Sequence, residues 1–295
     1  MTLDPTHGAG PADGLLDPAA LDALESLMRG RRAVALAGAG MSTESGIPDY
    51  RGPEGRLRVR SPVQYNDFVR SDASRRRYWA RSVVGWSRVK KADPNPAHFA
   101  LAALESAGHV NGVITQNVDG LHQAAGSHRV IELHGNLAHV VCLECEDRRT
   151  RVDMQEDLAA LNADWLEARE ADDARIESAP DGDAELVGDP YDDFVVPGCR
   201  ICGGILKPDV VFFGENVPKP RVDEAWSLLD AADVLLILGS SLTVFSGRRF
   251  VYGANEREMP VAVVNLGPTR ADEVAAVKVE GQLGVIVPDL AERLG

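Results

Sequence analysis

The sequence predicts an α/β fold, in which a doubly wound, Rossmann-like parallel sheet carries a small cysteine-rich module and a helical insertion. Three observations support this prediction. Nearly continuous Val/Ile/Leu segments alternate with helical patterns, two Cys-x-x-Cys pairs interrupt that alternation, and an arginine- and aromatic-rich stretch separates the first strand from the next helix. Strands of this kind are typical of a parallel sheet that helices cover on both faces. A chain of 295 residues is long enough for one large domain with a small one attached.

The alternation begins after an N-terminal arm rich in Pro, Gly and Asp. Leu21, Leu24, Leu27 and Met28 recur at helical spacing, and Gly30 ends this first helix. Strand patterns follow at 32–38, 110–115, 129–133, 208–215, 233–241 and 260–268. Helical patterns lie at 94–108, 221–232, 248–258 and 284–294. Helices between apolar strands predict the doubly wound arrangement.

Changes of composition predict the domain boundaries. Between Val140 and Arg200 the apolar strands disappear, and acidic, Pro and Gly residues accumulate. We therefore expect the following division: a flexible arm at 1–18, three parts of the sheet domain at 19–55, 96–138 and 205–295, a helical insertion at 56–95, and a zinc-binding module with a long acidic insertion at 139–204.

Charge and hydropathy exclude some classes of partner. The chain has 45 acidic and 31 basic residues, a net charge of −14, whereas proteins that bind nucleic acids usually present a basic face. No apolar run approaches the roughly 20 residues that span a bilayer. The first 28 residues contain no Lys or Arg, which signal and transit peptides require. We expect a cytoplasmic protein without nucleic-acid or membrane partners; its oligomeric state stays open, and a monomer is compatible with the sequence.

The four cysteines are the most specific local signal. Cys142 and Cys145 form one Cys-x-x-Cys pair, and Cys199 and Cys202 form the other. Four thiolates from two short turns give a closed tetrahedral Zn²⁺ site, which holds a module together and leaves no position open for water. The two pairs are farther apart than is usual for such sites. We interpret the acidic stretch between them as an insertion, with four ordinary buried cysteines as the alternative.

Small and polar residues follow several of the predicted strands. Gly38 and Gly40 come after the first strand, but Thr43 stands where a dinucleotide fingerprint would have its third glycine. That match alone is weak, and a tight turn without a ligand would explain it equally well. The segments 239–241 and 265–267 also end strands with such residues. Because the carboxyl ends of parallel strands line one crevice, these ends together predict a ligand site.

Three residues at neighbouring strand ends are candidates for catalysis. His134 follows the strand at 129–133 and could serve as a base, although a lone histidine is often structural. Asn117 and Asp119 follow the strand at 110–115 and could either contact a ligand or shape a turn. Their occurrence together with the glycine loop favours ligand contact.

The motifs, taken in order, resemble those of sirtuins, the NAD-dependent protein deacylases. They are GAGMSTESGIPDYR, TQNVDGLH, ELHG, the two cysteine pairs, KPDVVFFGE, GSSL and VNLG, and the resemblance runs from about Leu21 to the C-terminus. FVRSDASRRRYWARSVVGW, PNPAHFAL and KPDVVFFGE look closest to class II, in particular to the branch of the fourth mammalian sirtuin. The acid-rich N-terminus departs from that branch, as expected for a bacterial or other cytosolic relative.

The resemblance implies a role for each motif. His134 would be the general base for the ribose hydroxyls of NAD, and Asp119 would hold the nicotinamide carboxamide with help from Ile47, beside Asn117. The cofactor would be NAD, together with one structural Zn²⁺. The implied NAD contacts are Gly38, Ala39, Gly40, Ser42, Glu44, Ile47, Pro48, Asp49, Tyr50, Arg51, Gln116, Asn117, Val118, Asp119, Gly239, Ser240, Ser241, Asn265, Leu266, Gly267 and Leu283.

The implied substrate is an acyl-lysine protein that binds as an added β-strand. The residues expected to contact it are Val211, Phe213, Gly214, Glu215 and Val244. Tyr78 and Arg81 have the three-residue spacing with which some class II members bind succinyl or malonyl groups, so acidic acyl groups are candidates, as are the bulky ones associated with the branch. Alternatively, Tyr78 packs in the core and Arg81 lies at the surface.

Other functions remain open on sequence alone. The same NAD site could transfer ADP-ribose to a protein, and this is the main alternative. A non-enzymatic NAD sensor would not need a base such as His134. A zinc hydrolase is disfavoured because four cysteines leave no open coordination position. A nicotinamide-linked dehydrogenase is the weakest alternative.

Overall fold

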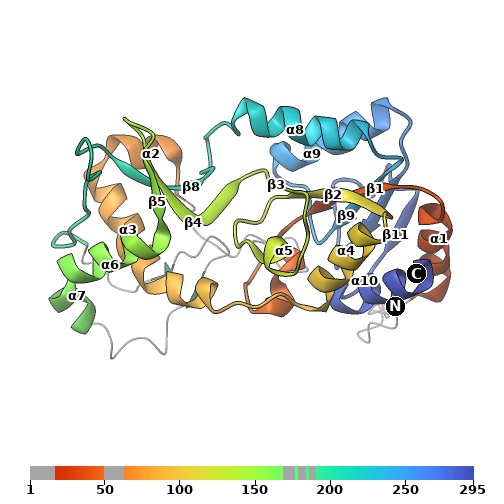
Figure 1. Cartoon of the computed structure of the whole chain (residues 1–295), viewed down its shortest axis with the longest axis horizontal. Helices are drawn as coiled ribbons and strands as arrows, with labels where there is room; N and C mark the ends of the chain where they lie inside the picture. The colour runs from red at the N-terminus through yellow and green to blue at the C-terminus, as the bar shows by residue number, and fades with distance from the viewer. Residues whose placement is uncertain (1–16, 50–62, 169–176, 179–183, 186–190) are drawn as a thin grey trace, which may run out of the picture.

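The computed structural model describes residues 17–49, 63–168, 177–178, 184–185 and 191–295. Its main sheet consists of six parallel strands in the order β11-β10-β9-β1-β2-β3 (Figure 1). These strands are β1 (Ala33–Ala37), β2 (Val110–Thr115), β3 (Val130–Glu132), β9 (Val234–Leu238), β10 (Val261–Val264) and β11 (Val277–Val279). The chain builds outward from β1 in one direction and from β9 in the other. The strand order therefore reverses between β1 and β9, which is where open α/β sheets bind their ligands.

Helices cover both faces of this sheet, so β1 and β9 are buried along their whole length. α1 (Pro18–Met28), α4 (Pro96–Ser106) and α10 (Leu283–Leu294) share one core cluster with alternate residues of the central strands. α8 (Lys219–Asp230) and α9 (Phe245–Glu256) pack with the remaining strand residues in the cluster of the opposite face. Burial on both sides explains why these strands read as continuous apolar runs.

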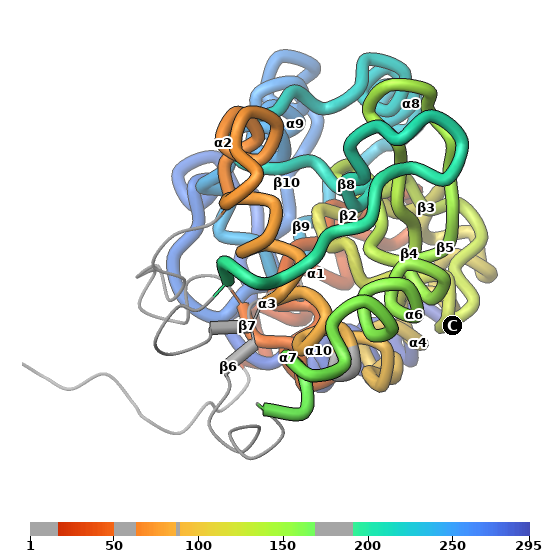
Figure 2. The backbone as a smooth tube through the Cα atoms, turned by 90° about the vertical axis from the view of Figure 1, so that its left-hand side faces the viewer, coloured from red at the N-terminus to blue at the C-terminus, as the bar shows by residue number. Residues whose placement is uncertain are grey.

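A smaller lobe lies beside the sheet, at the end of the molecule away from the C-terminus (Figure 1). Its three-stranded antiparallel sheet has the order β5-β4-β8. The lobe contains α2 (Tyr65–Arg70), α3 (Asp72–Lys90), β4 (Gly135–Cys142), β5 (Arg148–Thr150), α6 (Arg151–Leu161), α7 (Ala163–Glu167) and β8 (Leu206–Val210). Figure 2, which faces this lobe, shows α3 and α6 in front of the main sheet. The two insertions of the sequence therefore share one core, which includes Trp79, Val140 and Leu158.

Shorter elements complete the described part of the chain. They are the 3₁₀ turns η1 (Ala39–Met41) and η2 (Thr43–Ser45), the helix α5 (Leu121–Ala124), and the strand pair β6 (Glu177–Ser178) and β7 (Ala184–Glu185). No described helix has the length and apolar character that crossing a membrane requires. The cytoplasmic location stays a prediction.

Most predicted elements of the main sheet and its helices are confirmed, and one strand is wrong. The run 208–215 does not belong to the main sheet: β8 begins earlier, pairs antiparallel with β4 and ends at Val210. A turn follows, in which the Glu215 amide donates to the Phe212 carbonyl at 3.0 Å and Gly214 has a φ of +79°. An apolar run shows that a strand is buried but not which sheet it joins. The short strand β11 was missed.

Candidate active site

A cavity of about 880 Å³ opens at the carboxyl ends of β1, β2, β3, β9 and β10. The segment after β8 closes it on the side of the smaller lobe, and Gln282 and Leu283, where α10 begins, contribute to the opposite side. This volume is in the range of sites that enclose a small molecule. The cavity lies at the carboxyl ends of the strands, where the sequence predicts a ligand site, and at the reversal of strand order.

Two glycine-containing loops meet at the base of the cavity, one after β1 and one after β9. The Gly40 amide donates to the Gly239 carbonyl at 2.8 Å. A Cβ on Gly38 would lie 2.6 Å from the Ser240 Cβ, and one on Gly40 would lie 2.9 Å from the Gly239 Cα. Side chains at these positions would push the loops apart. Glycine is therefore required by the contact between the two loops, in addition to any approach of a ligand.

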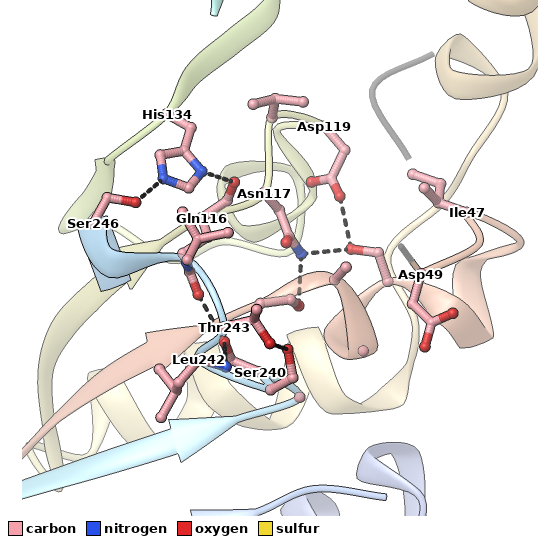
Figure 3. Close-up of a pocket in the computed structure, with 18 of the residues that line it drawn as sticks. Ile47, Asp49, Gln116, Asn117, Asp119, His134, Ser240, Leu242, Thr243 and Ser246 are labelled. Atoms are coloured by element: carbon pink, nitrogen blue, oxygen red, sulfur yellow. Dashed lines mark hydrogen bonds between the residues drawn. The ribbon is translucent and has the colours of Figure 1, made fainter. Parts of the chain in front are cut away.

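Ser42 connects Asp119 and Asn117, which are labelled in Figure 3, in one hydrogen-bonded cluster. Its hydroxyl donates to Asp119 Oδ2 at 2.7 Å and accepts from Asn117 Nδ2 at 3.0 Å. Asn117 Nδ2 also donates to the Gly38 carbonyl at 3.0 Å, and the Leu121 amide donates to Asp119 Oδ1 at 3.0 Å. Burial raises the pKa of Asp119, and the bonds from Leu121 and Ser42 oppose that rise. The cluster presents a fixed acceptor to the cavity.

His134 lies two residues after β3, and its half-buried ring faces the same cavity. Nδ1 is 3.0 Å from the Gln116 carbonyl, and Nε2 is 2.7 Å from Ser246 Oγ (Figure 3). Burial lowers the pKa of His134 to about 4; the bond to Gln116 opposes this, while the positive charges of Arg249 and Arg221 add to it. The imidazole is therefore neutral at pH 7 and able to accept a proton.

Hydroxyl and amide groups line the part of the cavity next to the carboxyl ends of β9 and β10. Ser240 Oγ donates to Gln116 Oε1 at 2.7 Å, and Asn265 Nδ2 donates to the carbonyls of Leu266 and Gly267 at 3.0 and 3.1 Å. Glu44 accepts a 2.7 Å bond from the Gly284 amide in the first turn of α10. A carboxylate at a helix N-terminus is favourable, and here it ties the loop after β1 to α10.

Most residues predicted to bind the cofactor line this cavity. They are Gly38, Ala39, Gly40, Ser42, Glu44, Ile47, Asp49, Gln116, Asn117, Val118, Asp119, Gly239, Ser240, Ser241, Asn265, Leu266 and Leu283. Pro48 and Gly267 are not among the lining residues. Tyr50 and Arg51 lie outside the described residues. The volume and the position at the strand ends fit a dinucleotide.

The residues predicted to contact the substrate divide into two groups. Val211, Phe213, Gly214, Glu215 and Val244 line the cavity. Tyr78 and Arg81 are not among its described lining residues. Tyr78 packs edge-on against Phe68, Trp79 and Phe212, with ring centroids 5.2 to 5.6 Å apart. Arg81 is 4% exposed, so it does not lie at the surface, contrary to the alternative given for it.

Several lining residues were not predicted, among them Ser246 and Arg249 of α9. Arg249 is the only Lys or Arg among the described residues that line the cavity, and its guanidinium lies 5.4 Å from the Phe245 ring centroid. Both residues could have been found from the sequence. α9 begins soon after β9 ends, so polar side chains in its first turns are close to the strand ends.

The four cysteines lie together in the smaller lobe. All four Sγ atoms are within 4.8 Å of one another, with 3.5 Å between Cys142 and Cys202 and 3.6 Å between Cys145 and Cys199. Four thiolates around one Zn²⁺ at about 2.3 Å would be about 3.8 Å apart. The Ile201 amide donates to Cys199 Sγ and the Gly204 amide to Cys202 Sγ, both at 3.4 Å. The donor set fits a closed structural zinc site, with all four cysteines as ligands.

The Sir2 family model matches residues 38–246. An "NAD-dependent protein deacetylase" of Xanthomonas campestris pv. campestris (strain 8004) is 51% identical over 256 residues, which cover 87% of this chain and 85% of that protein. "NAD-dependent protein deacetylase 1" of Streptomyces coelicolor is 48% identical over 294 residues, covering 100% and 95%. A solved structure described as "Sir2-p53 peptide-NAD+" has a TM-score of 0.68 and 32% identity, covering 92% of this chain and 95% of that one.

Proposed function

The chain belongs to the Sir2 family and is an NAD-dependent protein deacylase, and we propose that one cavity brings NAD and acetyl-lysine together, with His134 as the general base. The observation that carries this proposal is a shared location. The neutral imidazole of His134 and the cluster of Ser42, Asn117 and Asp119 line the same cavity at the carboxyl ends of the strands. A base and a carboxamide acceptor on one wall suit this chemistry.

Each residue has one task in this proposal. NAD, when bound, supplies a glycosidic bond to nicotinamide whose cleavage drives removal of the acyl group. Asp119 Oδ2, oriented by Ser42, accepts a hydrogen bond from the carboxamide, and the apolar side chain of Ile47 covers that end of the cavity. His134 takes up a proton at Nε2 while the Gln116 carbonyl holds Nδ1–H. Ser240, Ser241 and Asn265 contact the adenosine end.

We propose that the substrate peptide binds as a strand between 213–215 and the loop before α9. Phe213 and Val244 are 38% and 41% exposed, and both line the cavity. The backbone of Phe213 already pairs on one edge, since its carbonyl accepts from the Tyr65 amide at 2.9 Å and Gln64 bridges it. An added strand would give affinity through main-chain bonds with little reading of sequence.

The class and the acyl preference are narrower proposals. We place the chain in class II on the motifs quoted above, from the arginine-rich stretch of α3 to KPDVVFFGE. A preference for acidic acyl groups would need a cation near the acyl end, and Arg81 was predicted to supply it. Bulky acyl groups are the second candidate. The described cavity lining includes the apolar residues Val63, Val118 and Phe212, which would suit neutral acyl groups such as acetyl.

Product analysis tests the proposed function. The protein is incubated with NAD and an acetyl-lysine peptide, and the products are identified by mass spectrometry. We expect deacetylated peptide, nicotinamide and O-acetyl-ADP-ribose in equal amounts. ADP-ribose attached to protein, without loss of acetyl, would instead show ADP-ribosyl transfer, which the relatives do not favour. No NAD-dependent product with any acyl peptide would refute the proposal.

A further inference from the structure

Ser246 is the only residue of α9 that forms a hydrogen bond with His134 in the described part of the chain. It is the second residue of that helix, is 9% exposed and lines the cavity. Its Oγ is 2.7 Å from His134 Nε2, as Figure 3 shows. Ser246 has no part in the sequence prediction or in the function proposed above.

The two contacts of the imidazole fix its protonation pattern. The Gln116 carbonyl can only accept, so Nδ1 of His134 carries the proton. In the neutral ring Nε2 then has the lone pair, and the Ser246 hydroxyl donates to it. The nitrogen proposed to accept a proton in catalysis is therefore the one that Ser246 contacts. Both ring nitrogens are held, which restricts rotation of the imidazole.

The start of α9 is packed so that Ser246 reaches this position. A Cβ on Gly247 would lie 2.5 Å from Gln116 Nε2, so a side chain at residue 247 would displace the Gln116 amide group. The Gln116 side chain is itself fixed by the 2.7 Å bond from Ser240. One residue, Gln116, thus holds Nδ1 of the base through its carbonyl and meets α9 through its side chain.

We propose that Ser246 is a positioning residue for His134: its hydroxyl donates to Nε2 and so holds the ring in the orientation that keeps this nitrogen at the cavity. The inference rests on the proposed function, because it assigns Ser246 a role only if His134 is the base. Ser246 transfers no proton in this role; it only donates a hydrogen bond. The hydroxyl has to give way or rotate when another O–H group approaches Nε2, which a serine side chain can do at little cost.

Two variants and one control test the proposal. Ser246→Ala removes the hydroxyl, and Ser246→Thr restores it with one added methyl group. Ser227→Ala removes another helical hydroxyl, which donates to the Asp223 carbonyl on the exposed side of α8. Two quantities are measured: the ¹⁵N shift of His134 Nε2 in NAD-free protein, assigned with a His134→Gln variant, and the kcat and KM for an acetyl-lysine peptide and NAD.

In wild-type protein we expect the shift of a hydrogen-bonded acceptor nitrogen. In Ser246→Ala it should move toward that of a free imidazole nitrogen, and kcat should fall about 10-fold with KM changed less than about 2-fold. Ser246→Thr should recover most of the wild-type Nε2 shift and most of the wild-type kcat. Ser227→Ala should match wild type in both quantities.

An unmoved Nε2 resonance in Ser246→Ala, or a moved resonance with unchanged kcat, would overturn the role of Ser246. A wild-type protein that is inactive with every acyl peptide would refute the proposed function, whatever the resonance shows. The NMR measurement on NAD-free protein therefore separates the two failures.

Discussion

At the scale of single residues, Ser42, Asn117 and His134 owe their chemistry to partners that are distant in sequence. Ser42 comes from the loop after β1, whereas Asn117 and Asp119 follow β2. His134 follows β3 and is bonded by Gln116 on one side and Ser246 on the other. The types of residue could be read from the motifs, but their hydrogen bonds exist only because parallel strands end at one edge.

Substitution of Arg81 tests the predicted acyl preference. If its guanidinium reaches an acidic acyl tail when substrate is bound, Arg81→Met should lower kcat/KM for succinyl-lysine and glutaryl-lysine peptides at least about 10-fold more than for acetyl-lysine. The measurement is a comparison of these three peptides with wild type and variant. Since Arg81 is 4% exposed and outside the described lining, equal losses on all three would assign it to the core.

Two buried histidines, His98 and His122, and the half-buried His134 predict that acid destabilises the fold. Burial lowers the pKa to about 4 for His98 and His134 and to about 3 for His122. Below pH 6.5 the unfolded chain binds protons that the native protein does not. The free energy of unfolding should therefore fall as pH decreases from 6.5 to 4, by about 1.4 kcal/mol per pH unit for each such histidine.

Urea unfolding between pH 7.5 and 4.5 measures this slope, and His122 offers a test of its origin. His122 is buried, with its ring 4.9 Å from that of His98. His122→Leu should flatten the pH dependence, whereas His128→Gln, at an exposed position, should leave it unchanged. Parallel curves for wild type and His122→Leu would show that other groups cause the acid sensitivity.

At the scale of elements, the contact between the loops after β1 and β9 forms the base of the cavity. Gly239 has a φ of +61°, and a Cβ there would lie 2.5 Å from the Met41 nitrogen and 2.8 Å from Leu283 Cδ1. A side chain would push the loop after β9 away from the loop after β1 and from Leu283 of α10. Because the same loops line the cavity, stability and cofactor affinity should depend on this contact together.

Gly239→Ala should therefore lower the free energy of unfolding by roughly 3 kcal/mol and raise the Kd for NAD about 10-fold or more. Gly108→Ala is the matched control, since Gly108 also has a positive φ, +82°, but a Cβ there would meet nothing within 4 Å. We expect it to cost only about 1 kcal/mol and to leave NAD affinity unchanged. Thermal unfolding and calorimetric titration measure both quantities, and equal effects of the two substitutions would rule out crowding as the cause.

The sequence was a good guide to those elements whose residues alternate in burial or run continuously through the core. α1, α4, β1 and β9 were predicted because their packing is recorded in local patterns. β8 was assigned to the wrong sheet because its partner, β4, belongs to the lobe that the cysteines organise. Ser246 was missed because the helical pattern was read from residue 248, whereas α9 begins at Phe245 and brings Ser246 to His134.

At the scale of the whole molecule, the cysteine site and the cavity are connected through two strands. Cys142 is the last residue of β4, which pairs with β8, and the chain after β8 forms the cavity wall from Val211 to Glu215. Lys207 of β8 also pairs with Glu215 at 3.0 Å across the turn. The cysteine site therefore stabilises the wall where the substrate peptide is proposed to bind.

Removal of the metal should affect peptide binding before NAD binding. The purified chain should contain one Zn²⁺, and a chelator strong enough to remove it should lower thermal stability and raise the KM for peptide several-fold more than the Kd for NAD. Metal analysis and steady-state kinetics on the chelated and reconstituted protein measure this. Cys202→Ala should behave like the chelated protein, and full stability and activity in that variant would contradict a structural metal site.

We propose that His134 acts in the chemistry and not in binding the cofactor. The most direct test compares wild type with His134→Ala by calorimetric titration of NAD and by turnover of an acetyl-lysine peptide. Because the Ser42, Asn117 and Asp119 cluster is independent of the imidazole, the Kd for NAD should change less than about 3-fold, whereas turnover should fall at least about 100-fold. A variant that retains turnover, or one that loses NAD binding altogether, would contradict the account.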